Sequence, residues 1–438
     1  MASTYLSKTF STTGNRQKFT LSMWFKRGIV PVGNESGTEK MLFQAYQDSG
    51  NQDQIWLQSN GTINYVRNNA NAVTPSQMLR DPSAWYHVVF AGDTTQGSNA
   101  DRLKVYINGT QAPIGQQDTI TQGSNFGAIN NAQSYTFGKR NSNDWYFDGL
   151  MANVEMVDGQ QYGPEYFGST DSNTGIWKPG GSSAISNYGT NGFKLKMDTT
   201  SPGADTSGKG NTFTPSGTPT LLQGSPSNVW CTWNPLIPDT TNYVYSNGNN
   251  TVNQTSSSWV KTVSTMGVTK GKWYWEVKSV DNDTSAGKYT VVGVANTTTS
   301  TAASGMPANG IGYKSNGEVQ RLGAITNIGA YTAGNIISCY LDMDNEALYY
   351  AKNGVMLNSG VPTSGASKTG AFTMPVANST YFASLSTYGS KAEANFGEGF
   401  FGTTAAGTQA DDNGQGLFAY DVPAGYYALN TKNLEAYG

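Results

Sequence analysis

AWYHVVFAGDTTQGSNADRLKVYING, residues 84–109, decides the fold class of this chain. Residues 85–90 alternate between two faces, and residues 103–108 do the same after a polar loop. The second run ends at Asn108-Gly109, a turn dipeptide whose glycine accepts a positive φ. Two runs of period two joined by a loop predict an antiparallel pair of strands.

The composition extends this prediction to the whole chain. Its 438 residues include 52 glycines, and 12% are aromatic, which favours many short strands separated by turns. That length suggests about two to three domains. Because only 13% of the residues are charged and the net charge is −3, the chain lacks the basic stripe of a nucleic-acid binder.

Alternating segments fall into two groups. The first group includes residues 19–25, 63–66 and 145–157, and the second begins near residue 229. Between them, residues 166–227 are rich in Gly, Ser, Thr, Asn and Pro, which indicates a partly ordered connector. We therefore expect an all-β fold of two antiparallel, jelly-roll-like β-sandwich domains joined by a Gly/Ser/Asn-rich connector.

Two motifs in the first group carry a family resemblance. They are the W-x-H-V strand with its Y-x-N-G turn inside 85–109, and Y-F-D-G-x-x-A-x-V at 146–154. Both are similar to the laminin-G/concanavalin A-like sandwiches. The resemblance covers about the first 165 residues and implies a domain that binds ligands rather than one that catalyses.

Five motifs in the second group occur in the order of a SPRY (B30.2) domain. They are G-K-W-Y-W-E-V (271–277), V-G-V (292–294), I-I-S-C-Y-L-D (336–342), Y-A-K-N-G (350–354) and A-N-F-G (394–397). The resemblance implies a bent antiparallel sandwich whose loops bind protein partners. Binding residues differ between members of this family, so none is transferred to this chain.

The order of the laminin-G-like sandwich, the connector and the SPRY-like sandwich resembles the order in structural proteins of tailed, marine-type bacteriophages. W-N-P-L at 233–236 and the tail after residue 418 add to that resemblance. It implies a virion component, most simply a tail fibre or appendage that binds host surface glycan or a neighbouring virion protein. A homo-oligomer is expected, with a trimer favoured. Two alternatives are a head-decorating fibre or capsid-associated protein and a polysaccharide depolymerase.

The expected domain boundaries follow from these patterns. They are 1–165 for the laminin-G-like sandwich, 166–227 for the connector, 228–402 for the SPRY-like sandwich and 403–438 for the tail. The opening MASTYLSKTF has no basic or apolar signal region, and no apolar run is long enough to cross a membrane. We expect a protein made in the host cytoplasm and located in the virion, without membrane insertion.

Trp145 and Tyr146 are the candidate ligand-binding residues. They follow the turn-like run at 141–144, and aromatic side chains on loops stack on sugars or dock partners. The alternative is that they begin a strand and pack inside. No cofactor is expected.

Catalytic residues are not expected. His87 is the one histidine, and its place in an alternating strand favours a buried imidazole. The acidic residues near aromatics form no compact cluster of the kind a glycosidase needs: Asp144, Asp148, Glu155, Glu276, Asp342 and Asp344. The chain is therefore predicted not to be an enzyme.

Metal binding and disulfides are not expected either. Four aspartates could supply loop oxygens to calcium, but D-x-D-x-D spacing is absent and solvated carboxylates are favoured: Asp93, Asp101, Asp144 and Asp148. Cys231 and Cys339 are predicted to be free and buried.

Overall fold

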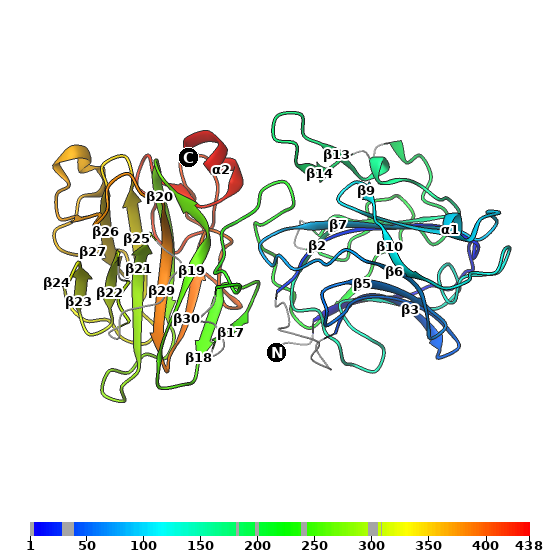
Figure 1. Ribbon diagram of the computed structural model, residues 1–438, viewed down its shortest axis with the longest axis horizontal. Coiled ribbons are helices and arrows are strands. Elements are labelled where there is room, and N and C mark those ends of the chain that lie inside the picture. Colours follow the sequence, from blue (N-terminus) through cyan, green and yellow to red (C-terminus); the bar gives the residue numbers. More distant parts are fainter. Residues whose placement is uncertain are drawn as a thin grey trace. The chain divides into compact units, whose positions relative to one another are not determined.

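The computed structural model of the chain describes residues 4–28, 39–180, 184–197, 201–237, 243–296, 305–307 and 309–438. It contains 43% strand and 5% helix, which confirms the predicted all-β fold. The chain divides into two compact units, residues 1–221 and 222–438 (Figure 1). No helix among the described residues is long and apolar enough to span a bilayer.

Unit 1 is a sandwich of two antiparallel sheets. The first sheet contains, in spatial order, β10 (Ile114–Gln117), β6 (Ala70–Pro75), β5 (Ile63–Arg67), β4 (Asn51–Leu57), β3 (Lys40–Asp48), β11 (Ser134–Phe137), β1 (Tyr5–Thr9) and β16 (Thr214–Ser216). The second contains β15 (Phe193–Leu195), β12 (Leu150–Asp158), β2 (Lys18–Lys26), β7 (Tyr86–Asp93), β8 (Leu103–Ile107) and β9 (Thr110–Gln111). Smaller elements are α1 (Asn99–Arg102), η1 (Pro164–Tyr166), β13 (Gly168–Thr170) and β14 (Trp177–Pro179).

The predicted strand pair at 84–109 is β7 and β8. They are antiparallel, with Val88 opposite Ile107. Asn108 and Gly109 form the turn to β9 with φ of 48° and 82°, the two positive values that a type I′ turn requires. Alternation along β7 and β8 places Val88, Phe90 and Val105 in the core between the sheets.

The segment predicted as a connector completes the first sandwich. β15 pairs with β12, and β16 pairs with β1, so residues from this segment extend both sheets. Phe193, Leu195 and Phe213 are buried in the core of unit 1. The division between the two compact units lies at 221/222, within the segment 166–227 that was predicted as a connector. The alternation of F-K-L-K-M at 193–197 does indicate the strand β15, whereas the segment around β16 has too little periodicity to reveal that strand.

A buried carboxylate on β4 holds one loop of unit 1 in place. Asp53 is fully buried, and its oxygens accept hydrogen bonds from the backbone N–H groups of Gly127, Ala128 and Ile129 at 2.6–3.2 Å. The Tyr65 hydroxyl donates a fourth bond at 2.5 Å. Burial raises the pKa of Asp53, and these four donors oppose that rise.

Unit 2 is a second sandwich. Its larger sheet contains β17 (Tyr243–Ser246), β18 (Thr251–Gln254), β30 (Lys391–Asn395), β20 (Lys272–Ser279), β25 (Ile336–Asp342), β26 (Ala347–Lys352) and β27 (Val355–Met356), with β28 (Phe372–Thr373) beside β26 and β33 (Tyr427–Ala428) beside β20. The smaller sheet contains β19 (Trp259–Val268), β29 (Tyr381–Tyr388), β21 (Tyr289–Ala295), β22 (Gly310–Lys314), β23 (Glu318–Arg321) and β24 (Ala324–Asn327). Outside the sheets lie η3 (Pro362–Ser367), the hairpin β31 (Phe400–Phe401) and β32 (Thr404–Ala405), and α2 (Thr431–Tyr437).

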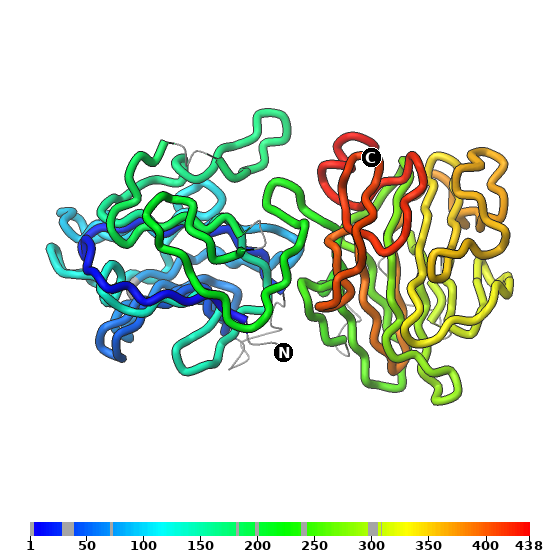
Figure 2. Tube along the Cα trace, turned by 180° about the vertical axis from the view of Figure 1, so that it is seen from behind, coloured from blue at the N-terminus to red at the C-terminus, as the bar shows by residue number. Residues whose placement is uncertain are grey.

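The predicted tail, red in Figure 2, is a layer of unit 2 rather than an appendage. β20 is buried on both faces: Trp273 and Trp275 face the core between the sheets, and Tyr274 packs with Phe418 and other aromatic residues on the outer face. β33 adds to β20 in parallel, and Asn430 caps α2 by accepting a bond from the Asn433 N–H.

Glu276 ties the tail to β20. Its carboxylate is fully buried and accepts the backbone N–H groups of Ala419 and Tyr420 at 3.0 Å each. The Tyr274 hydroxyl at 2.8 Å and the Asn395 amide at 3.2 Å complete the set of donors. Burial raises the pKa of Glu276, and the donors oppose the rise.

Replacing this carboxylate should destabilise unit 2. In Glu276→Gln, an amide NH₂ group replaces one of the two acceptor oxygens and faces either the Ala419 N–H or the Tyr420 N–H. We expect the free energy of unfolding to fall by about 3 kcal/mol, because buried donors lose their partner. Urea unfolding measures the loss, and limited proteolysis should cut the tail faster.

Glu435→Gln, on the exposed side of α2, is the control and should change stability by less than about 0.5 kcal/mol. Equal stability of the two variants would contradict this role for Glu276.

Candidate ligand-binding site

The candidate residues Trp145 and Tyr146 lie in the loop between β11 and β12 of unit 1. A tight turn shapes this loop: the Asn143 N–H donates to the Arg140 carbonyl at 3.0 Å, and the Arg140 N–H donates to the Asp144 carbonyl at 3.1 Å. The Met41 N–H then donates to the Trp145 carbonyl at 2.8 Å, which anchors the end of the turn to β3. Both candidate side chains are half-buried.

Trp145 belongs to a group of three side chains, Trp56, Arg140 and Trp145, which we call the Trp145 platform. The Arg140 guanidinium carbon lies 4.0 Å from the Trp145 ring centroid. The rings of Trp56 and Trp145 lie 5.5 Å apart at an interplanar angle of 59°. Such cation–π and aromatic contacts hold the group together while it remains accessible.

The platform has a polar rim. Arg140 Nε donates to Asp144 Oδ1 at 2.7 Å, and a second guanidinium nitrogen bonds to the other carboxylate oxygen. The Ser142 hydroxyl also donates to Asp144, at 2.7 Å. The pair with Arg140 holds the pKa of Asp144 below its usual range, so this carboxylate is an acceptor rather than a general acid.

The Trp145 backbone is strained. Its φ is +50°, in the left-handed region, which costs a non-glycine residue about 1–2 kcal/mol. Bulky aromatic residues seldom adopt this conformation, and strain of this kind gathers at functional sites. Here it directs a large aromatic side chain to a partly exposed position.

Sequence reasoning identified Trp145 but not Trp56 or Arg140. Trp56 lies between Ile55 and Leu57, both buried, so its position in the alternating strand faces outward. A tryptophan on the outward face of a predicted strand could have indicated a binding surface. Arg140 carried none, because its approach to Trp145 depends on how the turn closes. Tyr146, the other candidate, makes no ring contact with the platform among the described residues.

His87 is buried at 1% exposure, as the alternating strand predicted. The Trp177 indole N–H donates to Nδ1 at 2.9 Å, which leaves Nε2, 2.8 Å from the Ser22 hydroxyl, as the protonated nitrogen. The ring stacks on Trp24 at 4.7 Å and on Trp177 at 6.0 Å. Burial lowers the pKa of His87 to about 3, so the imidazole is neutral and has a structural role.

The other acidic candidates bind to nearby groups of the protein. Glu155 accepts the Tyr188 hydroxyl at 2.5 Å, and Asp342 accepts the Asn345 N–H at 3.0 Å and pairs with Lys272 at 3.1 Å. Asp344 accepts the Gly271 N–H at 2.8 Å. These contacts fix turns and strands rather than forming a pair of free acids.

The four calcium candidates each have a cationic partner. The pairs are Asp93 with Lys18, Asp101 with Lys104, Asp144 with Arg140 and Asp148 with Lys40. Within the described ranges, no three His, Cys, Asp or Glu residues gather closely enough to hold a metal ion. Cys231 and Cys339 are both buried and are not joined in a disulfide, as predicted.

Two family models match the chain. The model of the concanavalin A-like lectin/glucanase superfamily matches residues 2–160, and the SPRY domain model matches residues 272–398. The chain therefore contains a concanavalin A-like domain followed by a SPRY domain, in the predicted order.

Several solved structures are similar to part of the chain. The SPRY domain of human HERC1 is 18% identical, with 37% of this chain and 96% of that chain covered at a TM-score of 0.31. The heptameric SAP-like pentraxin from Limulus polyphemus is 15% identical, with 36% and 71% covered at a TM-score of 0.27. The TRIM65 PSpry domain is 11% identical, with 37% and 89% covered at 0.28. No curated protein sequence matches the chain.

The burial of His87 should make stability depend on pH. The imidazole titrates near pH 6.5 in the unfolded chain and near 3 in the folded chain. Above pH 6.5 both states are neutral; as the pH falls below 6.5, only the unfolded chain binds the proton, so stability declines. The expected loss is about 1.4 kcal/mol per pH unit between pH 6 and 5, measured as the difference between wild type and His87→Gln in urea unfolding.

The single histidine allows a direct control. The imidazole proton resonance of the folded wild type should not titrate between pH 7 and 5. A native midpoint near 6.5 would contradict the buried, neutral ring.

Proposed function

We propose that this chain, a concanavalin A-like domain followed by a SPRY domain, is a non-enzymatic recognition protein that binds glycan through the Trp145 platform. The observation that supports this most strongly is the left-handed backbone of Trp145. A half-exposed tryptophan held in a strained conformation is poorly explained by packing alone, whereas ligand binding gives the strain a use.

The chemistry of the platform suits a sugar ring. Flat aromatic faces pack against the C–H groups of a pyranose, and charged groups at the edge bond to its hydroxyls. Trp56 and Trp145 supply the faces. The side chains of Arg140 and Asp144, 29% and 42% exposed, supply a donor and an acceptor at the rim.

Two further observations support binding without catalysis. Glycoside hydrolysis needs two carboxyl groups on either side of the scissile bond, one of them protonated. Asp144 is the carboxylate that bonds to Arg140 at the rim of the platform, and its pKa is lowered rather than raised. Four of the other acidic candidates accept hydrogen bonds from the protein's own donors: Glu155, Glu276, Asp342 and Asp344. Asp148 differs from these in lying half-buried beside Lys40, and burial raises its pKa.

We further propose that the chain is a component of a tailed bacteriophage virion, as a tail fibre or related appendage facing host surface glycan. The support is the order of the sequence motifs, in which a concanavalin A-like domain precedes the SPRY domain and the W-N-P-L stretch. Virion location, contact with other virion proteins and a homotrimeric state remain predictions. Mass spectrometry of purified virions and a density map of the particle test them, and absence from the particle would overturn this part.

Removing the Trp145 ring should abolish glycan binding without unfolding the domain. Asparagine tolerates a positive φ, so Trp145→Asn keeps the backbone conformation and deletes the stacking surface. We expect affinity for bacterial capsular polysaccharides and lipopolysaccharide oligosaccharides to fall at least about tenfold, the equivalent of one lost stacking contact of about 1.4 kcal/mol. An immobilised panel of these glycans identifies a ligand, and calorimetry then compares wild type and variant.

Trp177→Phe is the matched control. It also removes an indole from unit 1, but Trp177 is not part of the Trp145 platform, so glycan binding should remain intact. Undiminished binding by Trp145→Asn would contradict the platform. New reducing ends released from the polysaccharide would instead identify a depolymerase.

A further inference from the structure

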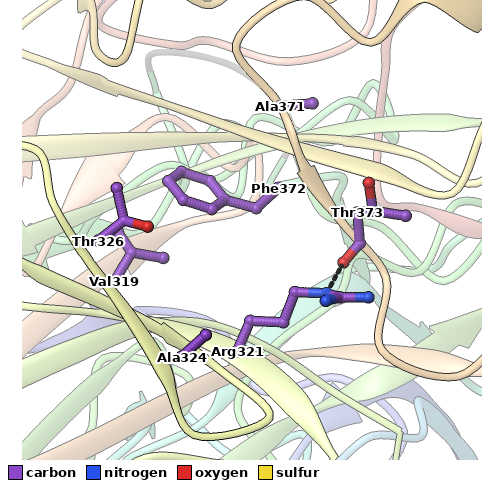
Figure 3. A pocket seen from close by; sticks show the side chains of 7 residues that line it. All are labelled: Val319, Arg321, Ala324, Thr326, Ala371, Phe372 and Thr373. Carbon is purple, nitrogen blue, oxygen red and sulfur yellow. Dashed lines mark hydrogen bonds between the residues drawn. The ribbon is translucent and has the colours of Figure 1, made fainter.

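A shallow depression of about 380 Å³ lies in unit 2, between strands of the smaller sheet and the segment that contains β28 (Figure 3). One wall comes from β23 and β24, at the end of the smaller sheet, and the other from β28, which pairs with β26 of the larger sheet. It is lined by Val319, Arg321, Ala324, Thr326, Ala371, Phe372 and Thr373. The phenylalanine ring and the guanidinium group lie on opposite sides of the space.

Next to the depression is a sheet edge with which no other strand pairs among the described residues. β24 is the last strand of its sheet, and all four of its residues, Ala-Ile-Thr-Asn, are exposed. Arg321 pairs with Ala324 across a two-residue turn, so Ala324 and Thr326 bond to β23 while the main chain of Ile325 and Asn327 faces outward. The strand has no charge and no proline, two devices that usually keep an exposed edge from pairing.

The hairpin also carries exposed apolar side chains at a strained turn. Leu322 is 58% exposed and Ile325 is 61% exposed. Leu322 and Gly323 have φ of 47° and 81°, so a leucine occupies a left-handed position that asparagine or glycine normally fills. As at Trp145, a large side chain is held in an unfavourable conformation at the surface.

Arg321 gives the surface an uncompensated charge. Its Nε donates to the Thr373 carbonyl at 2.6 Å, and another guanidinium nitrogen approaches the Met374 carbonyl at 3.5 Å. Both acceptors are neutral. Within the part of the chain that the structure describes, no carboxylate lies within ion-pair distance of this guanidinium.

We propose that the β24 edge and its depression bind an extended segment of another protein, by addition of a strand to the smaller sheet. The main chain of the segment would pair with the outward groups of Ile325 and Asn327. Alternate side chains would fall on the two faces of the sheet: apolar ones beside Ile325 and an acidic one over the depression, where its carboxylate meets Arg321. This site lies in the SPRY domain and does not depend on the glycan platform.

The test uses ten-residue fluorescent peptides of alternating valine and threonine with one central Glu, Gln or Lys, measured by anisotropy against the full chain. We expect the Glu peptide to bind at least tenfold more tightly than the Lys peptide. Arg321→Gln should bring the Glu and Lys peptides to within about twofold of each other. Ile325→Pro should weaken all peptides at least tenfold, because proline removes one outward N–H and is tolerated on an edge strand.

Val361→Ser is the matched control, since it removes another exposed apolar side chain of unit 2, 43% exposed, and should leave peptide binding unchanged. Circular dichroism confirms that each variant is folded. Absence of binding by every peptide, or unchanged binding by Ile325→Pro, overturns the proposal. Self-association of the wild type in sedimentation that Ile325→Pro abolishes also overturns it, because the occupant would then be a second copy of this chain.

Discussion

Burying a carboxylate is costly unless several donors surround it, and both sandwiches depend on such a carboxylate. Asp53 in unit 1 and Glu276 in unit 2 each lie on a strand, and each accepts bonds from backbone N–H groups of a distant irregular segment and from a tyrosine hydroxyl. An apolar residue at either position would leave those N–H groups without acceptors. The two carboxylates therefore specify where long segments without regular structure attach.

In each unit, one of the two sheets is also covered by apolar side chains on its outer face. In unit 1, a cluster containing Val89, Phe167 and Ile185 lies on the outer face of the second sheet, and Trp177 reaches His87 there. In unit 2, the tail covers Tyr274 and Tyr340 on the outer face of the larger sheet. Each unit is thus a two-sheet sandwich with a third, mostly irregular layer. Hydrogen bonds to buried polar side chains fix that layer, because it has few strands of its own.

The sequence predicted what depends on local alternation. The paired strands at 84–109, the inward faces of Trp273 and Trp275 and the buried His87 all follow from a period of two. The sequence did not predict features that depend on contacts between residues far apart in the chain or on how a turn closes. Phe213 belongs to the first core but is isolated in polar sequence, and Arg140 approaches Trp145 only after a turn with positive φ forms. The exposed edge of β24 was equally hidden, because a strand's neighbours in a sheet are not encoded in its own residues.

Because β20 is buried on both faces, the segment that matches the SPRY domain model is shorter than the segment that must fold together. The SPRY match ends at residue 398, yet the outer face of β20 is covered by residues from 418 to 428. A fragment cut at the limits of the match would leave Tyr274 and Tyr340 in water and the Glu276 carboxylate without two of its donors. Such a fragment would expose a continuous aromatic surface and would tend to aggregate. Autonomous folding therefore requires the longer span from about residue 222 to 438, and protein engineering of this domain should respect that span.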